Sequence, residues 1–177
     1  MIIVVTGFDN TGKTTLSNQL VEHYNSKHHS IINIAHSPGP VGKVKQTKWM
    51  QKQLDMQKGF PRPLKVYDRF TSIEEMVYGP VLRDKSNFKL EDKIFQDFKD
   101  LHPLIIYTRP PRDCIFNFGT REQMEGVIEK APQLLNAYDD VAFKLIAQHW
   151  DVLVYDYTVD KALDRLFSQL AYKFFIN

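Results

Sequence analysis

The feature of this sequence that most constrains its fold is the segment Gly7–Thr14, which reads Gly-Phe-Asp-Asn-Thr-Gly-Lys-Thr. It fits the pattern G-x-x-x-x-G-K-[ST], the P-loop that wraps nucleotide phosphates. The all-apolar run Ile2–Val5 before it predicts a strand buried on both faces. Leu16, Leu20 and Tyr24 after it lie at helical spacing. Strand, glycine loop and helix therefore follow in the order that a P-loop requires, whereas a simple glycine turn would not need Lys-Thr at its end.

The residue types of this loop suit phosphate binding. Gly7 and Gly12 allow a tight turn that points backbone N–H groups at an anion. Lys13 supplies a mobile positive charge for the β- and γ-phosphates, and the Thr14 hydroxyl is placed to ligate Mg²⁺. The following helix adds the positive end of its dipole. We expect ATP and Mg²⁺ as cofactors, and the candidate cofactor-binding residues are Asp9, Asn10, Thr11, Gly12, Lys13, Thr14 and Thr15.

Four further short apolar runs alternate with amphipathic helices along the chain. They predict strands at residues 31–35, 64–67, 103–107 and 152–155. We therefore expect an α/β fold, a P-loop NTPase-type doubly wound five-stranded parallel sheet with helices on both faces, in a single domain over residues 1–177. Such a fold places its chemistry in the loops at the carboxyl ends of the strands. Ser72 and Glu75 predict a capping box for the helix after the third strand, and Gly79-Pro80 predicts that this helix is kinked or split.

Composition and charge narrow the function classes. The chain has 43% hydrophobic and 25% charged residues, as soluble globular enzymes do, and its formal net charge of +2 provides no broad attraction to nucleic acid or membranes. The single Cys114 excludes an internal disulfide and fits a reducing compartment. No apolar run approaches the ~20 residues of a membrane span, and the first strand leaves no room for a signal peptide. We expect a cytoplasmic protein whose partners are small molecules.

The pair Asp68-Arg69 is the second strong signal, because it directly follows a predicted strand. An acid at that place can hold the water shell of Mg²⁺ beside a P-loop, and an arginine can clamp a phosphate with two hydrogen bonds. The alternative is a weak surface ion pair. The negative charge of Asp9 is unfavourable inside an anion-binding loop unless the carboxylate accepts a hydrogen bond from a sugar hydroxyl or pairs with an arginine. The alternative role of Asp9 is a side-chain contact that stabilises the turn.

Several motifs together resemble one enzyme family. Residues 7–15 resemble the G-x-D-x-x-G-K-[ST]-T loop of thymidylate kinases. Residues 68–70, Asp-Arg-Phe, and the later Tyr78-Gly79 are similar to that family's Asp-Arg-Tyr and Ala-Tyr-Gln-Gly stretches. Residues 36–39, His-Ser-Pro-Gly, stand where the family carries Arg-Glu-Pro-Gly. Residues 104–111 are similar to thymidylate kinases and deoxynucleoside kinases alike, and the compact layout resembles phage-encoded deoxynucleoside monophosphate kinases.

The chain also departs from the family pattern. His36 replaces an arginine, and Tyr78 lies one residue farther from the Asp-Arg pair than the family places it. Only residues 41–63 separate the Pro-Gly loop from the third strand, where thymidylate kinases have a longer insert whose helix reads thymine. A base would then be stacked by Trp49 or Phe70, although core packing is the alternative for Trp49.

The resemblance implies an ATP- and Mg²⁺-dependent (deoxy)nucleoside monophosphate kinase, which transfers the γ-phosphoryl group of ATP to a dNMP to give a dNDP. The acceptor site would lie in segments 36–40 and 68–79, and a lid at about residues 117–130 would carry Arg121, for which a solvated loop arginine is the alternative. The implied catalytic residues are Lys13, Arg69, Arg121 and Asp9. The implied substrate-binding residues are His36, Asp68, Arg69, Phe70, Tyr78 and Arg109, and the implied metal ligands are Thr14 and Asp68.

Two other functions compete with this one. A deoxynucleoside kinase would use Asp68 or Asp9 as the base for a sugar 5′-hydroxyl, but a phosphate acceptor is already ionised and needs no base. A nucleotide-binding regulator would transfer nothing, although the sequence lacks an Asn-Lys-x-Asp guanine motif and has several arginines downstream of the P-loop. Nucleotides are the expected partners, without nucleic acid or membrane; a homodimer is an open expectation, and a phage-encoded chain would act in the host cytoplasm.

Overall fold

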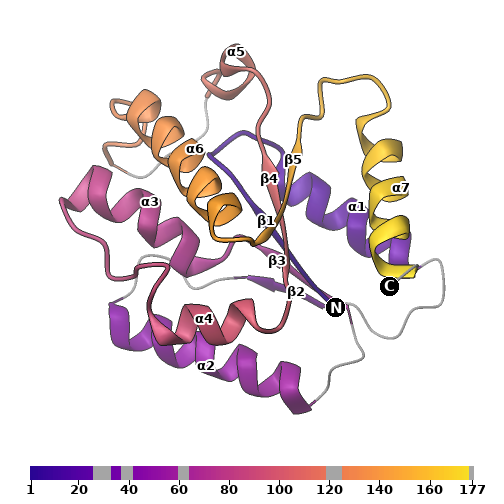
Figure 1. Cartoon of the computed structure of the whole chain (residues 1–177). Coiled ribbons are helices and arrows are strands. Elements are labelled where there is room, and N and C mark those ends of the chain that lie inside the picture. The colour runs from indigo at the N-terminus through magenta and orange to yellow at the C-terminus, as the bar shows by residue number, and fades with distance from the viewer. Residues whose placement is uncertain (26–32, 37–41, 60–63, 119–124, 176–177) are drawn as a thin grey trace.

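The structure is a computed structural model that describes residues 1–25, 33–36, 42–59, 64–118 and 125–175 (Figure 1). Its centre is a five-stranded sheet with the order β2-β3-β1-β4-β5. The strands are β1 (Ile2–Thr6), β2 (Asn33–His36), β3 (Lys65–Asp68), β4 (Leu104–Thr108) and β5 (Asp151–Tyr155), and all neighbouring pairs are parallel. The α/β fold with a parallel sheet, expected from the apolar runs, is confirmed.

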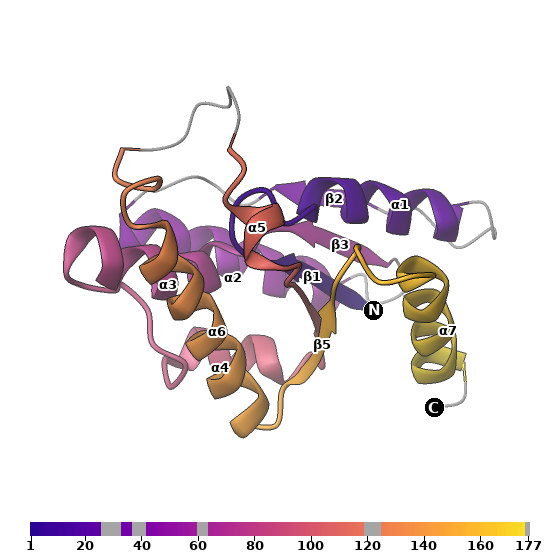
Figure 2. The ribbon, with the colours of Figure 1, turned by 90° about the horizontal axis from the view of Figure 1, so that it is seen from above.

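Seven helices in the described residues connect and cover these strands. They are α1 (Lys13–Asn25), α2 (Lys43–Gly59), α3 (Thr71–Arg83), α4 (Lys93–Lys99), α5 (Arg112–Ile115), α6 (Ala131–Ala147) and α7 (Ala162–Phe175). Helices α1 and α7 cover one face of the sheet, and α2, α3, α4 and α6 lie on the other (Figures 1 and 2). None of these helices is long and apolar enough to cross a membrane.

The core has two parts because successive strand side chains point to opposite faces of the sheet. In β1, Ile3 and Val5 belong to the cluster that includes Leu16 of α1 and Leu166 of α7, whereas Ile2 packs in the larger cluster on the other face. All five residues of β1 are buried, since strands pair with it on both edges. The loop that follows β1 therefore starts from the buried central strand of the sheet.

The larger cluster contains an aromatic group that fixes the start of α3. The Phe70 ring stacks on Phe98 with ring centroids 4.3 Å apart, and Trp49 and Tyr67 meet it edge-on at 5.6 Å each. Phe70 has no exposed surface. Its burial pulls the chain directly after β3 into the core, so that the Asp-Arg pair just before it stays at the sheet edge.

Ser72 and Glu75 do not form the capping box that was expected at the start of α3. Phe70 is its N-cap without a side-chain cap bond, and the Ser72 hydroxyl has no partner within the described residues. Glu75 instead accepts hydrogen bonds from Arg83 and from the Asn87 backbone N–H, so tertiary contacts replace the capping box. The helix continues through Pro80, which lies in its last turn, so α3 is not split there, and the expected kink stays a prediction.

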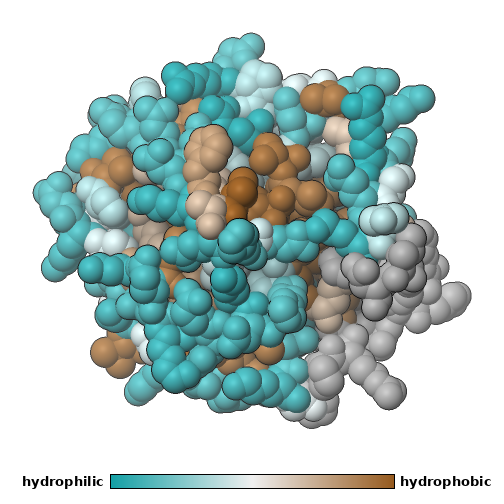
Figure 3. All heavy atoms as spheres, in the orientation of Figure 1, coloured by the Kyte–Doolittle hydropathy of each residue, from teal (hydrophilic) through white to brown (hydrophobic). Residues whose placement is uncertain are grey.

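The surface around β5 is rich in apolar groups. Figure 3 shows this face, with hydrophobic side chains gathered between α6 and α7. Val154 of β5 is 63% exposed, and Phe143 and Ile146 of α6 are 70% and 47% exposed. Among the strands that the structure describes, β5 is an edge of the sheet and pairs with β4.

Candidate active site

The loop between β1 and α1 has the backbone that phosphate binding requires. Gly7 has φ +147° and Gly12 has φ +81°. A Cβ atom on Gly7 would lie 2.4 Å from Thr108 Oγ1 and 2.6 Å from the Thr108 carbonyl oxygen, so only glycine fits beside β4. The Thr11 hydroxyl bonds the Phe8 carbonyl oxygen at 2.7 Å and lies 2.6 Å from Thr108 Oγ1. Contacts within the protein therefore shape and anchor the loop.

Lys13 lies beneath this loop with only 5% of its surface exposed. Its ammonium group donates to the Phe8 carbonyl oxygen at 2.5 Å, and its Nζ atom is 3.8 Å from Asp9 Oδ1. Burial lowers the pKa of Lys13, although Glu74 and Asp9 act in the opposite direction. The ammonium thus rests on protein oxygens that a phosphate could replace.

Thr14 and Asp68 meet at the other side of the loop. The Thr14 hydroxyl donates to Asp68 Oδ2 at 2.8 Å, because the pairing of Val5 with Asp68 brings the end of β3 beside β1. Asp68 Oδ1 is buried and has no hydrogen-bond partner within the described residues. An orphaned carboxylate oxygen next to a hydroxyl suits a hydrated Mg²⁺ ion, which takes one or two protein oxygens and keeps several waters. The described residues contain no cluster of three His, Cys, Asp or Glu side chains for a metal held by protein alone.

Arg69 adopts an unusual backbone conformation that aims its side chain over the loop. Its φ is +74°, in the left-handed region, and its N–H donates to the Val5 carbonyl oxygen at 2.9 Å. Its Nη2 atom donates to Asp9 Oδ1 at 2.9 Å, and the Tyr78 hydroxyl donates to Asp9 Oδ2 at 3.2 Å. Asp9 thus gathers Lys13, Arg69 and Tyr78 around one carboxylate.

Glu74 is a site residue that the sequence reasoning did not identify. It lies in the first turn of α3, and its Oε1 accepts a hydrogen bond from the Thr6 hydroxyl at 3.1 Å. The Tyr138 hydroxyl of α6 donates to its Oε2. Burial raises the pKa of Glu74, although Lys13 and Arg69 oppose this rise. Its only sequence signal is its place six residues after Asp68, at the expected start of a helix. Acidic residues are common in the first turn of helices because they interact favourably with the helix dipole, so this place did not indicate a site residue.

Four candidate residues are not part of the group around Asp9 in the described residues: Phe70, Arg109, His36 and Arg121. The Phe70 side chain is fully buried, which corrects its assignment to the substrate site, because a ring without exposed surface does not stack on a ligand. Arg109 donates from Nε and Nη2 to the two carboxylate oxygens of Asp139, at 2.8 and 3.1 Å, so its guanidinium serves an ion pair between β4 and α6. The backbone of His36 ends β2, whereas its side chain, residues 37–40 and Arg121 lie outside the described part of the chain.

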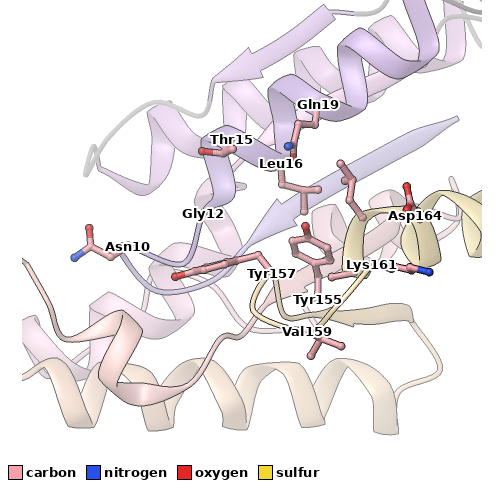
Figure 4. Close-up of a pocket in the computed structure, with 12 residues that line it drawn as sticks. Asn10, Gly12, Thr15, Leu16, Gln19, Tyr155, Tyr157, Val159, Lys161 and Asp164 are labelled. Atoms are coloured by element: carbon pink, nitrogen blue, oxygen red, sulfur yellow. The ribbon is translucent and has the colours of Figure 1, made fainter.

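A pocket of about 600 Å³ opens on the other side of the P-loop, between α1 and α7 (Figure 4). Its lining includes Gly12, Leu16, Tyr155 and Tyr157. A Cβ atom on Gly12 would lie 3.3 Å from a carbon of the Tyr157 ring, so this ring packs directly against the P-loop backbone. The pocket is continuous with the phosphate loop and has aromatic faces large enough for a nucleobase.

Comparisons with known proteins add the fold-level context. No protein-family model matches the chain, and no curated protein matches it. Among solved structures, YorR from Bacillus subtilis in complex with phosphorylated GDP is 16% identical, with TM-score 0.70 over 98% of both chains. Deoxyadenosine kinase from M. mycoides with bound dATP is 17% identical, with TM-score 0.64 over 96% of this chain and 98% of that one.

Thymidylate kinase from Ehrlichia chaffeensis is also similar, at 13% identity and TM-score 0.57 over 96% of both chains. These likenesses extend along nearly the whole length of each protein. At such low identity they establish a shared fold. The chain therefore has the fold of nucleotide and deoxynucleoside kinases.

Proposed function

We propose that this protein is an ATP- and Mg²⁺-dependent (deoxy)nucleoside monophosphate kinase that converts a dNMP to a dNDP. The observation that carries the proposal is the convergence of Lys13 and Arg69 on Asp9, at 3.8 and 2.9 Å, from opposite sides of the P-loop. A P-loop lysine serves the phosphates of the donor. Arg69, which faces Lys13 across Asp9, would bind the phosphate of a second nucleotide. Phosphoryl transfer between two nucleotides requires such a second phosphate site.

The donor would occupy the P-loop with its base in the pocket beside Tyr157. Lys13 would exchange the Phe8 carbonyl oxygen for the β- and γ-phosphates. Thr14 and Asp68 would hold Mg²⁺, which neutralises charge on the phosphates when it is bound. Because phosphoryl transfer needs little covalent help from the protein, alignment and positive charge account for the catalysis.

The acceptor would bind across the loop from the donor. Arg69 is 45% exposed, so its guanidinium has room to turn from Asp9 to an acceptor phosphate. Asp9 would then accept a hydrogen bond from a sugar hydroxyl, and Tyr78 would continue to orient that carboxylate. The complex of YorR with phosphorylated GDP supports a nucleotide that carries phosphate in this fold.

A deoxynucleoside kinase is the second candidate, and the likeness to deoxyadenosine kinase favours it. Such an enzyme needs a carboxylate with a free oxygen to accept the proton of a 5′-hydroxyl. Both oxygens of Asp9 are engaged by Arg69 and Tyr78, whereas Asp68 Oδ1 has no hydrogen-bond partner within the described residues and would be the base in such an enzyme. The phosphate acceptor is favoured because a nucleoside has no phosphate for the Arg69 guanidinium to bind.

One assay separates the candidates. The protein is incubated with ATP and Mg²⁺ and with each common deoxynucleoside or its monophosphate, and products are resolved by anion-exchange chromatography. Conversion of a dNMP to a dNDP, absent in Lys13→Ala, is the expected result. Phosphorylation of nucleosides alone would favour the second candidate, and ATP binding without transfer to any acceptor would indicate a regulator.

A further inference from the structure

The described part of the site contains more negative than positive groups before any nucleotide binds. Asp9, Asp68 and Glu74 are carboxylates, and Lys13 and Arg69 are the cations that face them. Under the proposed function, on which this inference rests, ATP and a monophosphate bring several further negative charges into the same space. Placing like charges together in a partly dry site is costly, so one of the carboxylates should become neutral.

The three carboxylates differ in what holds their charge. Asp9 forms ion pairs with Arg69 and Lys13, and Asp68 is the proposed partner of Mg²⁺. Glu74 accepts hydrogen bonds from two neutral hydroxyls, those of Thr6 and Tyr138. None of the ion pairs within 4.0 Å in the described residues includes Glu74 or Asp68. With Mg²⁺ beside Asp68, as proposed, Glu74 is the one of the three carboxylates whose charge has no cation in contact with it.

The groups around Glu74 come from every element packed against it. Lys13 of α1 and Arg69 after β3 favour the charged carboxylate through space, and so does the hydrogen bond from Tyr138 of α6. Burial and the negative charge of Asp9 favour the neutral acid. Tyr78, on α3 itself, is a neutral hydroxyl because burial, together with Glu74 and Asp9, raises its pKa. The ionised form thus depends on two cations that Glu74 does not touch.

Phosphate binding removes this support. When the donor phosphates pair with Lys13, the larger of the two positive contributions at Glu74 is cancelled while its burial remains, and an acceptor phosphate on Arg69 cancels the other. We propose that Glu74 takes up one proton from solvent as the phosphate groups of a nucleotide occupy the site. The new O–H on Oε1 donates to the Thr6 hydroxyl, which accepts in place of donating, and Tyr138 continues to donate to Oε2. Glu74 is then a positioning residue that holds β1, α3 and α6 together in both states without repelling the phosphates.

Calorimetry counts this proton directly. Binding of MgATP is measured from about pH 6 to about pH 9 in buffers of different ionisation enthalpy, for the wild type and for Glu74→Gln. Because the protonation change of ATP itself (second phosphate pKa about 6) is common to both proteins, the difference between them isolates Glu74. We expect a difference that reaches roughly half a proton to one proton at some pH. In that range the wild-type Kd should rise by up to about tenfold per pH unit, and the Kd of Glu74→Gln should stay nearly flat.

Two further variants complete the test. Glu75→Gln makes the same change one residue along the helix, where the acid is buried against Arg83, and should keep the wild-type proton count. Tyr138→Phe removes a hydrogen bond that favours the charged form, so the uptake should move to higher pH; this holds even if Glu74→Gln fails to fold. Equal proton counts in wild type and Glu74→Gln, or no shift in Tyr138→Phe, with MgATP binding and transfer intact, would overturn this inference alone. Absence of MgATP binding would overturn the proposed function and with it this inference.

Discussion

Replacing Arg69 by lysine tests the acceptor site most sharply, because charge is kept and only geometry is lost. In the free protein the contact with Asp9 is a single bond of 2.9 Å, and the arginine side chain is 45% exposed. A pair with that much solvent contributes about 0.2–1 kcal/mol. The free energy of unfolding of Arg69→Lys should therefore change by less than about 1 kcal/mol.

The acceptor complex is expected to respond much more strongly. Arginine can place two parallel hydrogen bonds on one phosphate, whereas lysine is a point charge that replaces one of them. Losing one charge-assisted hydrogen bond costs about 1.5–3 kcal/mol, which corresponds to a fall of roughly 10- to 150-fold in kcat/KM for the monophosphate. The Kd of MgATP without acceptor should barely change, since Lys13 holds the donor.

Steady-state kinetics with varied monophosphate, together with calorimetry of MgATP binding, measures both quantities. Arg83→Lys is the matched control: it changes an arginine of similar exposure (38%) at the opposite end of α3, which pairs with Glu75 in place of Asp9, and it should leave kcat/KM unchanged. An Arg69→Lys enzyme within about twofold of wild type would refute the two-bond reasoning. Equal losses in MgATP affinity and acceptor turnover would move Arg69 to the donor side.

Three other substitutions probe the remaining parts of the site. Lys13→Ala should abolish transfer while the melting temperature stays equal or rises, because burial already disfavours the ammonium charge; differential scanning calorimetry and the chromatographic assay measure both. Tyr157→Ala should raise the KM for ATP roughly tenfold, since stacking on a base is worth about 1–3 kcal/mol, with the acceptor KM unchanged. Glu74→Gln should gain stability relative to wild type as pH rises above about 4.5. Folding raises the pKa of Glu74, so the stability that its neutral form contributes is complete below the pKa of the unfolded chain and is lost as pH rises toward the pKa of the folded protein. Urea unfolding of both proteins at several pH values measures this trend. A difference in free energy of unfolding that does not change with pH would contradict it.

The parts of this molecule that the sequence predicted well are those with local signals. The run Ile2–Val5 forms a fully buried strand, and the glycines at 7 and 12 take the positive φ that the loop requires. The other strands lie close to the predicted ranges, because short apolar runs between helices have few alternatives in a parallel sheet. The pairing of β3 with β1 then brings Asp68 close to Thr14, so this contact can be predicted once the strand order and register are known.

The parts that the sequence did not predict depend on distant partners. Phe70 follows a strand end, where an aromatic ring can face either a ligand or the core; Phe98 and Trp49, from two other helices, decide for the core. Arg109 pairs with Asp139 of α6, a contact that the sequence did not indicate, and its expected role toward an anionic ligand stays a prediction. Glu74 is adjacent to Thr6 only after α3 has packed. In each case the residue that determines the contact lies more than twenty positions away in the sequence. Hydrophobic periodicity identifies local helices and strands and does not indicate such distant contacts.

The left-handed turn at Arg69 has a consequence for anyone who redesigns this protein. A φ of +74° costs a residue with a Cβ about 1–2 kcal/mol, and glycine avoids that cost. Sequence optimisation for stability alone would therefore select glycine at this position and delete the guanidinium that faces Asp9. The same logic applies to natural drift: a descendant released from its present function would be expected to lose this arginine early. Under the proposed function, glycine at position 69 would raise thermal stability and lower activity, so this position should be held constant in any thermostabilised version.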